Sequence, residues 1–225
     1  MQELVLGSVR LQLLPQRAVY IEAMRSLLVA DVHLGKPETF QAHGVPVSSQ
    51  INDATLARLQ RLCQTWRPQQ LWILGDLFHS QIGLVETVKE HWCRFLEEVA
   101  ISVHLLLGNH DRPLKAAWEE LSIHCWQELV QRDAVLLSHE PQPVMDADIL
   151  VNICGHVHPR IRLQTTLDSL RLPCFHWQPS QRRLTLPSFG EFTGGYDIAL
   201  SGDAVAYGVA EDQIIPFQGH CRRGS

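Results

Sequence analysis

The sequence lacks several features that would assign it to a special class of protein. No stretch of its 225 residues approaches the roughly 20 apolar residues that a membrane-spanning helix requires. The N-terminus has no basic start followed by a long apolar segment and a small-residue cleavage site, so a cytoplasmic location is expected. Internal repeats, low-complexity tracts and Gly/Ser linkers are also absent, and we expect a single domain over residues 1–225.

The sequence also lacks paired cysteine motifs and a net positive charge. The six cysteines are scattered without a CxxC pair, so free thiols are expected rather than disulfides or a thiolate zinc site. The net charge of −5 argues against nucleic-acid binding through the overall field of the protein. Five arginines and one acid between residues 160 and 183 fit either a local basic surface or an ordinary solvated strand face.

Short apolar runs alternate with amphipathic segments along the chain. Runs of strand length lie at residues 27–30, 71–74, 103–107, 134–137 and 149–154. Helices are predicted at residues 52–66, with Asn52 as N-cap, at 85–99 and, more weakly, at 114–121. This order predicts a largely parallel sheet, and the strand-like segments after residue 160 predict an added antiparallel part.

Each of the five apolar runs is followed by aspartate, asparagine or histidine. In chain order these residues are Asp31, His33, Asp76, Asn109, His139, His156 and His158. Ligands of open α/β sheets bind at the carboxyl ends of strands, so these side chains are predicted to converge. At a strand end, the residues of Asp-x-His and His-x-His would project to the same side.

The chemistry of these side chains favours a pair of divalent metal ions. Oxygen and imidazole donors without cysteine suit Mn²⁺, Fe or Zn²⁺, and seven side chains are enough for two ions that share a carboxylate. Glycine before Asp76, Asn109 and His156 permits tight turns and close approach. Taken singly, each motif has an ordinary structural explanation, because a lone buried histidine is usually a hydrogen-bonded core residue. Five motifs in order, each at a predicted strand end, favour the metal centre.

The motifs DVH, GDLFH, GNHD, SHEP and GHVHP, in this order, resemble the metallophosphoesterases of the calcineurin-like superfamily. The resemblance implies an α/β/β/α sandwich of two mixed sheets with a dimetal site at strand C-terminal ends. It also implies the ligand sets, which are Asp31, His33, Asp76 and His158 for one ion and Asp76, Asn109, His139 and His156 for the other. His110 would contact the phosphate beside Asn109 and act as general acid.

Further segments are similar to the ligase-associated DNA damage response endonuclease group, PdeM. They include LLVADVHLGK, GNHDR, GHVHPRIRL and LPSFGEFTGG. This resemblance implies an Mn²⁺-dependent DNA endonuclease linked to DNA repair, with DNA ligase or helicase partners. The glycine-rich residues 189–195 are interpreted as a turn near the cleft, because no P-loop context surrounds them.

Four more residues are candidates for a role in the reaction, each with an equally good structural explanation. His79 is a candidate catalytic residue or a surface hydrogen-bonding group. Asp111 is a candidate catalytic residue or a turn cap. Arg112 is a candidate phosphate contact or a solvated side chain, and Lys36 has the same even weighting.

These expectations describe one reaction. A hydroxide that bridges the two metals would attack phosphorus in line, and His110 would donate a proton to the leaving alkoxide. A phosphatase or a cyclic-nucleotide phosphodiesterase acting on a small substrate is the alternative, because the same centre serves these reactions. A scaffold without activity is disfavoured, because His110 is present in GNHD.

Overall fold

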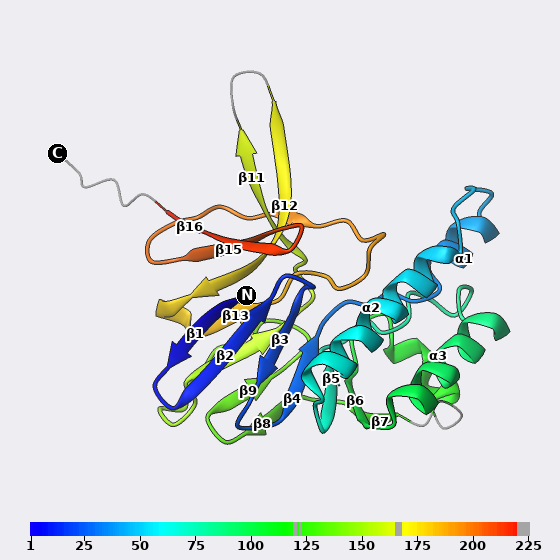
Figure 1. Ribbon diagram of the computed structural model, residues 1–225, viewed down its shortest axis with the longest axis horizontal. Coiled ribbons are helices and arrows are strands. Elements are labelled where there is room, and N and C mark those ends of the chain that lie inside the picture. Colours follow the sequence, from blue (N-terminus) through cyan, green and yellow to red (C-terminus); the bar gives the residue numbers. More distant parts are fainter. Residues whose placement is uncertain (119–120, 122, 165–167, 220–225) are drawn as a thin grey trace.

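The apolar runs and the helices between them fold into two mixed β-sheets in the computed structural model (Figure 1). The structure describes residues 1–118, 121, 123–164 and 168–219. The seven-stranded sheet contains, in spatial order, β1 (Gln2–Leu6), β2 (Val9–Leu14), β3 (Ala18–Ile21), β4 (Ser26–Val29), β5 (Gln70–Ile73), β6 (Ser102–Leu106) and β7 (His124–Trp126). Neighbours from β4 to β7 are parallel, as the strand–helix–strand order predicts. Neighbours from β1 to β4 are antiparallel, so this sheet is mixed and not largely parallel as expected.

The second sheet has nine strands and holds most of the chain after β7. They are β8 (Val130–Arg132), β9 (Val135–Leu137), β10 (Val151–Cys154), β11 (Pro159–Gln164), β12 (Ser169–Gln178), β13 (Arg183–Thr185), β14 (Tyr196–Asp197), β15 (Val205–Ala210) and β16 (Gln213–Gln218). Strands β9, β10 and β13 are parallel, whereas β11, β12, β15 and β16 pair antiparallel, which confirms the predicted antiparallel addition.

Two apolar cores hold the layers together. Helices α2 (Gln50–Trp66) and α3 (Glu86–Val99) cover one face of the seven-stranded sheet, where Leu59 and Trp92 pack with Ile73. The opposite face packs against the nine-stranded sheet through fully buried residues such as Leu28 and Phe175. Burial of each such side chain contributes about 1.5–3 kcal/mol. The two-sheet α/β architecture implied by the family resemblance is thus confirmed.

The helix ends depart from the prediction in one respect. Helix α2 begins after Ser49, and the prediction that Asn52 is its N-cap is wrong. Asn52 is buried in the first turn, where its amide donates to Glu38 at 2.8 Å and its oxygen accepts from the Gly35 N–H at 3.2 Å. Asn52 therefore ties α2 to the start of α1 (Lys36–Ala42).

The weaker predicted helix at residues 114–121 is replaced by a 3₁₀-helix at Arg112–Ala117. Residues 119, 120 and 122 lie outside the described residues. None of the described helices combines the length and apolar character needed to cross a membrane. The five described cysteines carry free thiols, as expected.

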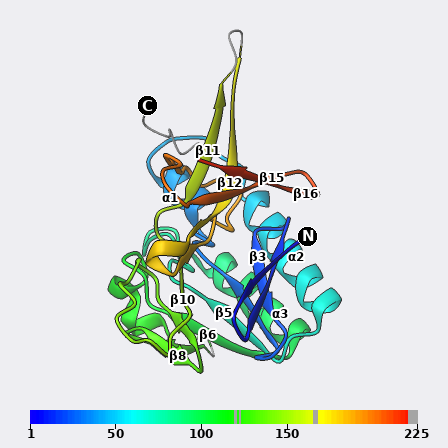
Figure 2. The ribbon, with the colours of Figure 1, turned by 90° about the vertical axis from the view of Figure 1, so that its left-hand side faces the viewer.

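The β11–β12 hairpin extends away from the rest of the molecule in both views (Figures 1 and 2). Arg160 and Arg171 of this hairpin both pair with Asp197, at 3.3 and 2.8 Å. The other three arginines of residues 160–183 also have partners within the chain: Arg162 with Ser169, Arg182 with three backbone carbonyls and Arg183 with Gln178. Two of the five arginines are therefore ion-paired with one acid, Asp197, and the local basic surface stays a prediction.

Candidate metal centre

The residues predicted as metal ligands gather where strands of both sheets end. Asp31 and His33 follow β4, Asp76 follows β5, Asn109 follows β6, His139 follows β9, and His156 and His158 follow β10. Nδ1 of His139 lies 2.9 Å from the carbonyl oxygen of Leu74, which joins the two sheets at this point. The structure therefore brings the seven side chains together, and their roles as ligands stay a prediction.

One group of donors surrounds Asp31. Ligand atoms of Asp31, His33 and His158 all lie within 4.8 Å of one another. Nε2 of His158 is 3.2 Å from Asp31 Oδ1, and Nε2 of His33 is 3.9 Å from Asp76 Oδ2. Nε2 of His33 is buried and lacks a hydrogen-bond partner in the described chain, whereas Nε2 of His158 lies within ion-pair distance of Asp31. A buried polar atom left unpaired costs about 1–3 kcal/mol, and a cation held between these donors would remove that cost.

A second group of donors surrounds Nε2 of His139. This atom lies 3.0 Å from Asn109 Oδ1, 3.1 Å from His156 Nδ1 and 3.7 Å from Asp76 Oδ2. Because Nδ1 of His139 donates to the Leu74 carbonyl, Nε2 presents a lone pair. Imidazole, amide and carboxylate donors turned toward one point fit a divalent cation of borderline hardness. The chain's residues therefore fit the metal ions that the family implies.

Burial and neighbouring charges tune the groups in this centre. Burial lowers the pKa of His33 far below its ordinary value, and the nearby His158 and Lys36 act in the same direction. Burial raises the pKa of Asp76, against the opposing effect of His139. For His158, burial lowers the pKa, but the interactions with Asp31 and Asp76 outweigh it and the net shift is upward. A neutral His33 is the form that can ligate a metal.

The backbone is left-handed at five of the seven predicted ligands. The φ angles are 55° at Asp31, 52° at His33, 52° at Asp76, 67° at His156 and 49° at His158. Such conformations are uncommon for residues other than glycine and cost roughly 1–3 kcal/mol each, so their clustering marks a functional site. Asp31 and His33 do point to the same side, as expected for alternate residues at a strand end, but their backbone is left-handed and not extended. The paired ligands meet because they leave the strands through left-handed turns.

Three glycines allow the ligand side chains to come close to the backbone. A Cβ atom at Gly75 would collide with the ring of His139, and one at Gly108 would collide with the carboxylate of Asp76. A Cβ atom at Gly155 would lie 2.7 Å from Asp31 Oδ2. The sequence predicted that these glycines permit close approach of the backbone. In the structure the groups that approach them are the side chains of the predicted ligands.

His110 lies beside the metal centre, and His79 positions it. Nδ1 of His110 lies 2.6 Å from the carbonyl oxygen of His79 and donates to it, so Nε2 faces Asp76 Oδ2 at 4.0 Å. The two imidazole rings stack at a centroid distance of 4.9 Å. About a third of the His110 side chain is exposed (35%), which leaves it within reach of a substrate.

His79 also contacts a predicted metal ligand. Its Nδ1 lies 3.4 Å from Nδ1 of His33. Burial, with Lys36 and His110, lowers the pKa of His79 to about 4, so its ring is neutral near pH 7. A neutral His79 can accept the Nδ1 proton of His33, which leaves the Nε2 lone pair of His33 for a cation.

Asp111 and Arg112 have different surroundings. Asp111 has no exposed surface, accepts hydrogen bonds from the N–H groups of Gly108 and Phe78, and thereby holds the GNHD loop. Burial raises its pKa to about 7, although these hydrogen bonds oppose the shift. Arg112 is exposed and lines a hollow of about 250 Å³ together with His139.

The glycine-rich segment 189–195 supports Asp31 from behind. The Ser188 hydroxyl and the Gly190 N–H both donate to the carbonyl oxygen of Asp31, at 2.9 and 3.0 Å. The Phe189 N–H donates to Ala30 at 2.8 Å. The predicted turn near the cleft is therefore in contact with the backbone of a candidate metal ligand.

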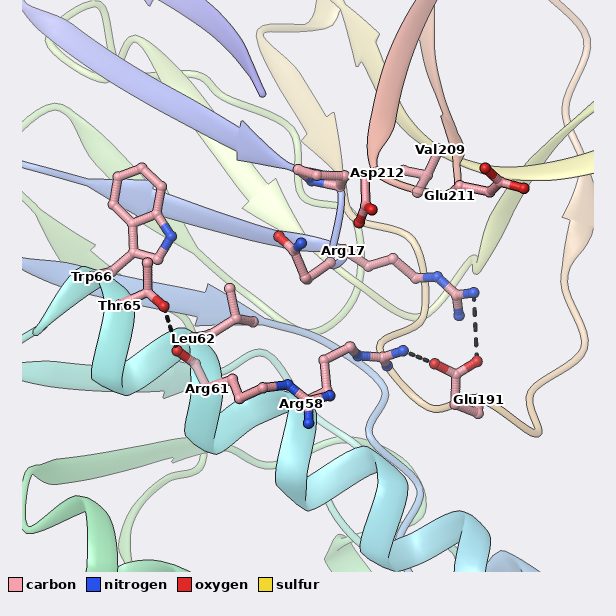
Figure 3. A pocket seen from close by; sticks show the side chains of 12 residues that line it. Arg17, Arg58, Arg61, Leu62, Thr65, Trp66, Glu191, Val209, Glu211 and Asp212 are labelled. Atoms are coloured by element: carbon pink, nitrogen blue, oxygen red, sulfur yellow. Dashed lines mark hydrogen bonds and ion pairs between the residues drawn. The ribbon is translucent and has the colours of Figure 1, made fainter.

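Two arginines from distant parts of the chain clamp this segment (Figure 3). Arg58 of α2 donates to the Phe189 carbonyl, lies over the Phe189 ring at 4.2 Å and pairs with Glu191. Arg17 pairs with Glu191 at 3.7 Å from the other side. Burial, with Arg17 and Arg61 nearby, lowers the pKa of Arg58 to about 9. These side chains line a cavity of about 540 Å³, and no sequence motif pointed to them.

Comparison with known proteins identifies the family. The family model of calcineurin-like phosphoesterases matches residues 24–142, which is more than half of the chain. Among solved structures the chain is similar to Pseudomonas putida nuclease MPE, with a TM-score of 0.81 and 34% identity over 96% of this chain and 99% of that one. It also matches Yfce, a phosphoesterase from E. coli, with 18% identity and a TM-score of 0.45 over 84% of this chain and 96% of that one. A search of curated proteins gives no match. The chain belongs to the calcineurin-like phosphoesterase family.

Proposed function

We propose that the chain is a dinuclear metal-dependent nuclease that hydrolyses phosphodiester bonds, with DNA as its substrate. The observation that carries this proposal is the position of Asp76 Oδ2, which lies 3.9 Å from Nε2 of His33 and 3.7 Å from Nε2 of His139. One carboxylate oxygen thus faces both donor groups, as a bridging ligand must. The similarity to a nuclease over nearly the whole chain favours nucleic acid as the substrate.

Asp31, His33 and His158 would hold one ion, Asn109, His139 and His156 the other, and Asp76 would be shared. When bound, a pair of divalent ions neutralises the charge of the phosphoryl group and activates a water molecule for attack. The donor set suits Mn²⁺, with Fe or Zn²⁺ as the other candidates. Proton donation, phosphate contact and positioning of the ligands are assigned to side chains around these residues.

His110 is the proposed proton donor. Its Nδ1–H is fixed on the His79 carbonyl, so the protonated ring directs Nε2–H toward the centre. As the bond between phosphorus and the leaving oxygen breaks, this proton passes to the alkoxide, which would otherwise leave as an anion. Arg112 is proposed to contact a flanking phosphate, because it is exposed beside His139.

His79 and Asp111 are proposed to act through their neighbours. His79 orients His33 through its ring and His110 through its carbonyl group. Asp111 is fully buried and accepts backbone hydrogen bonds of the GNHD loop, so it does not reach a substrate. DNA repair and ligase or helicase partners stay predictions that rest on the family resemblance, and a cytoplasmic location stays a prediction from the sequence.

Substitution of His110 tests the proton-donor role. His110→Ala should lower kcat on a DNA oligonucleotide by roughly 10²–10⁴-fold, because a poor leaving group needs protonation. Hydrolysis of a bis(4-nitrophenyl) phosphate, whose leaving group needs no proton, should fall much less. Mn²⁺ affinity, measured by calorimetry, should stay close to that of the unmodified protein. Full activity of His110→Ala on DNA would refute the proton-donor role.

A substrate panel tests the nuclease proposal itself. The protein is incubated with Mn²⁺ and labelled single-stranded DNA, double-stranded DNA, RNA, cyclic nucleotides, an aryl phosphodiester and an aryl phosphomonoester. Cleavage of an oligonucleotide supports the proposal. Cleavage of the small esters alone would reject it in favour of a phosphatase or cyclic-nucleotide phosphodiesterase.

A further inference from the structure

An exposed phenylalanine lies on the glycine-rich segment next to the metal centre. Phe192 follows the clamped Glu191 and keeps 39% of its surface exposed. Phe40 of α1 meets it edge to face, with ring centroids 5.4 Å apart and planes at 78°. The Lys36 ammonium lies 5.9 Å from the centroid of the Phe192 ring. Phe192 is therefore held in place by two neighbours without being covered by them.

The open surface beside these side chains is hollowed. A cavity of about 300 Å³ is lined by Lys36, Phe40, Glu191, Phe192, Thr193 and Gly194. A single exposed apolar residue is ordinary on a protein surface. Exposed aromatic rings with cationic side chains nearby are the surfaces on which proteins stack the bases of single-stranded nucleic acid.

The cavity lies near one of the predicted metal ligands, His33. A second hollow, of only about 10 Å³, is lined by His33 and shares Lys36, Glu191, Phe192 and Thr193 with the first. Lys36 lies only three positions after His33, at the start of α1. Thr193 adds a hydroxyl oxygen that is buried without a hydrogen-bond partner in the described chain. A cation and an aromatic ring therefore lie next to each other in the neighbourhood of His33.

We propose that Phe192, supported by Phe40 and Lys36, is a stacking platform for an unpaired nucleobase next to the scissile phosphate. This inference rests on the proposed nuclease function and names its substrate as nucleic acid with an accessible base, in a single strand or at a frayed end. The Phe192 ring stacks on the base, and the Lys36 ammonium contacts the adjoining backbone phosphate. A base inside a duplex is covered on both faces, so it cannot stack on the platform without leaving the helix.

Binding of two matched probes tests the platform. One probe is a short labelled single-stranded DNA, and the other has the same length and the same phosphates but abasic sugars throughout. Fluorescence anisotropy with Ca²⁺ in place of Mn²⁺ reports affinity separately from turnover. Phe192→Ala should weaken binding of the base-containing probe by roughly 5- to 100-fold and leave the abasic probe unchanged. Phe192→Trp should retain the affinity.

The control is Leu170→Ala, which removes another exposed apolar side chain, on the β11–β12 hairpin. It should bind both probes as the unmodified protein does. Equal effects of Phe192→Ala on the two probes, or no effect on either, would overturn the platform. Cleavage with Mn²⁺ is measured in parallel. A protein that shows the predicted binding pattern but cleaves no oligonucleotide rejects the nuclease proposal alone, whereas cleavage without this pattern rejects the platform alone.

Discussion

Replacement of Arg58 by methionine should weaken both the fold and the metal centre. The guanidinium donates to the Phe189 carbonyl, covers the Phe189 ring and pairs with Glu191. The Phe189 and Gly190 N–H groups in turn bond to the backbone of Ala30 and Asp31. Methionine keeps the apolar stem of the side chain and removes only its charged group, so the effect reports on the clamp.

The expected loss of stability follows from these contacts. A hydrogen bond from a charged donor is worth about 1.5–3 kcal/mol. The cation–π contact adds about 0.5–1 kcal/mol, and the pair with the half-exposed Glu191 adds about 0.2–1 kcal/mol. Because such contributions are not fully additive, the predicted loss is about 2–4 kcal/mol. In a chain of this size each kcal/mol lowers Tm by about 2–4 °C, so a decrease of roughly 4–16 °C is expected.

The effect on the metal centre is separate and is measured on the folded protein. Looser support of Asp31 should weaken Mn²⁺ binding by roughly 10- to 100-fold, the usual cost of losing a group that orients a ligand. Urea unfolding without metal gives the stability, and calorimetry gives the affinity. Arg61→Met is the matched control, because Arg61 lies on the same helix and lines the same cavity. The reasoning would be refuted if the free energies of unfolding of Arg58→Met and Arg61→Met differed by less than about 0.5 kcal/mol and the two variants bound Mn²⁺ equally well.

Two further predictions concern histidines. His79→Ala should lower Mn²⁺ affinity about tenfold or more, because His33 loses its Nδ1 partner. It should reduce turnover less than His110→Ala does, because the backbone carbonyl of residue 79 still holds the His110 ring. An unchanged Mn²⁺ affinity in calorimetry would contradict this prediction. His176 is buried in β12, and burial, with Arg183, lowers its pKa to about 4 from the ordinary 6.5. Its stabilising contribution is complete above pH 6.5 and is lost as the pH falls toward 4, by about 3 kcal/mol at 1.36 kcal/mol per pH unit. The His176→Gln variant should not show this loss of stability in acid. If the free energy of unfolding fell equally in the two proteins between pH 7 and pH 4, His176 would not be its source.

The positions of the metal ligands could be predicted because they depend on local patterns. An apolar run followed by Asp, Asn or His identifies a strand end without knowledge of its partners, and the parallel order then brings the ends together. The backbone conformation could not be predicted in this way. Asp31 and His156 are left-handed because the loops around them hold them so, and residue type alone favours an ordinary conformation.

Contacts between residues far apart in the chain could not be predicted from the sequence either. Arg17 and Arg58 meet Glu191 across more than 130 positions, and neither arginine stands in a motif. Asn52 resembled an N-cap because its type and position suited one, but its side chain bonds to Glu38 and Gly35 of another segment. Tertiary partners thus decided the roles of these residues, and local propensity did not.

Titration of metal-free protein with Mn²⁺, with bound metal and cleavage of single-stranded DNA followed together, tests the central claim most directly. Two ions per chain should bind, and cleavage should appear as the second ion is bound, because Asp76 faces both donor groups. Full cleavage with one ion per chain, or without metal, would contradict a dinuclear nuclease.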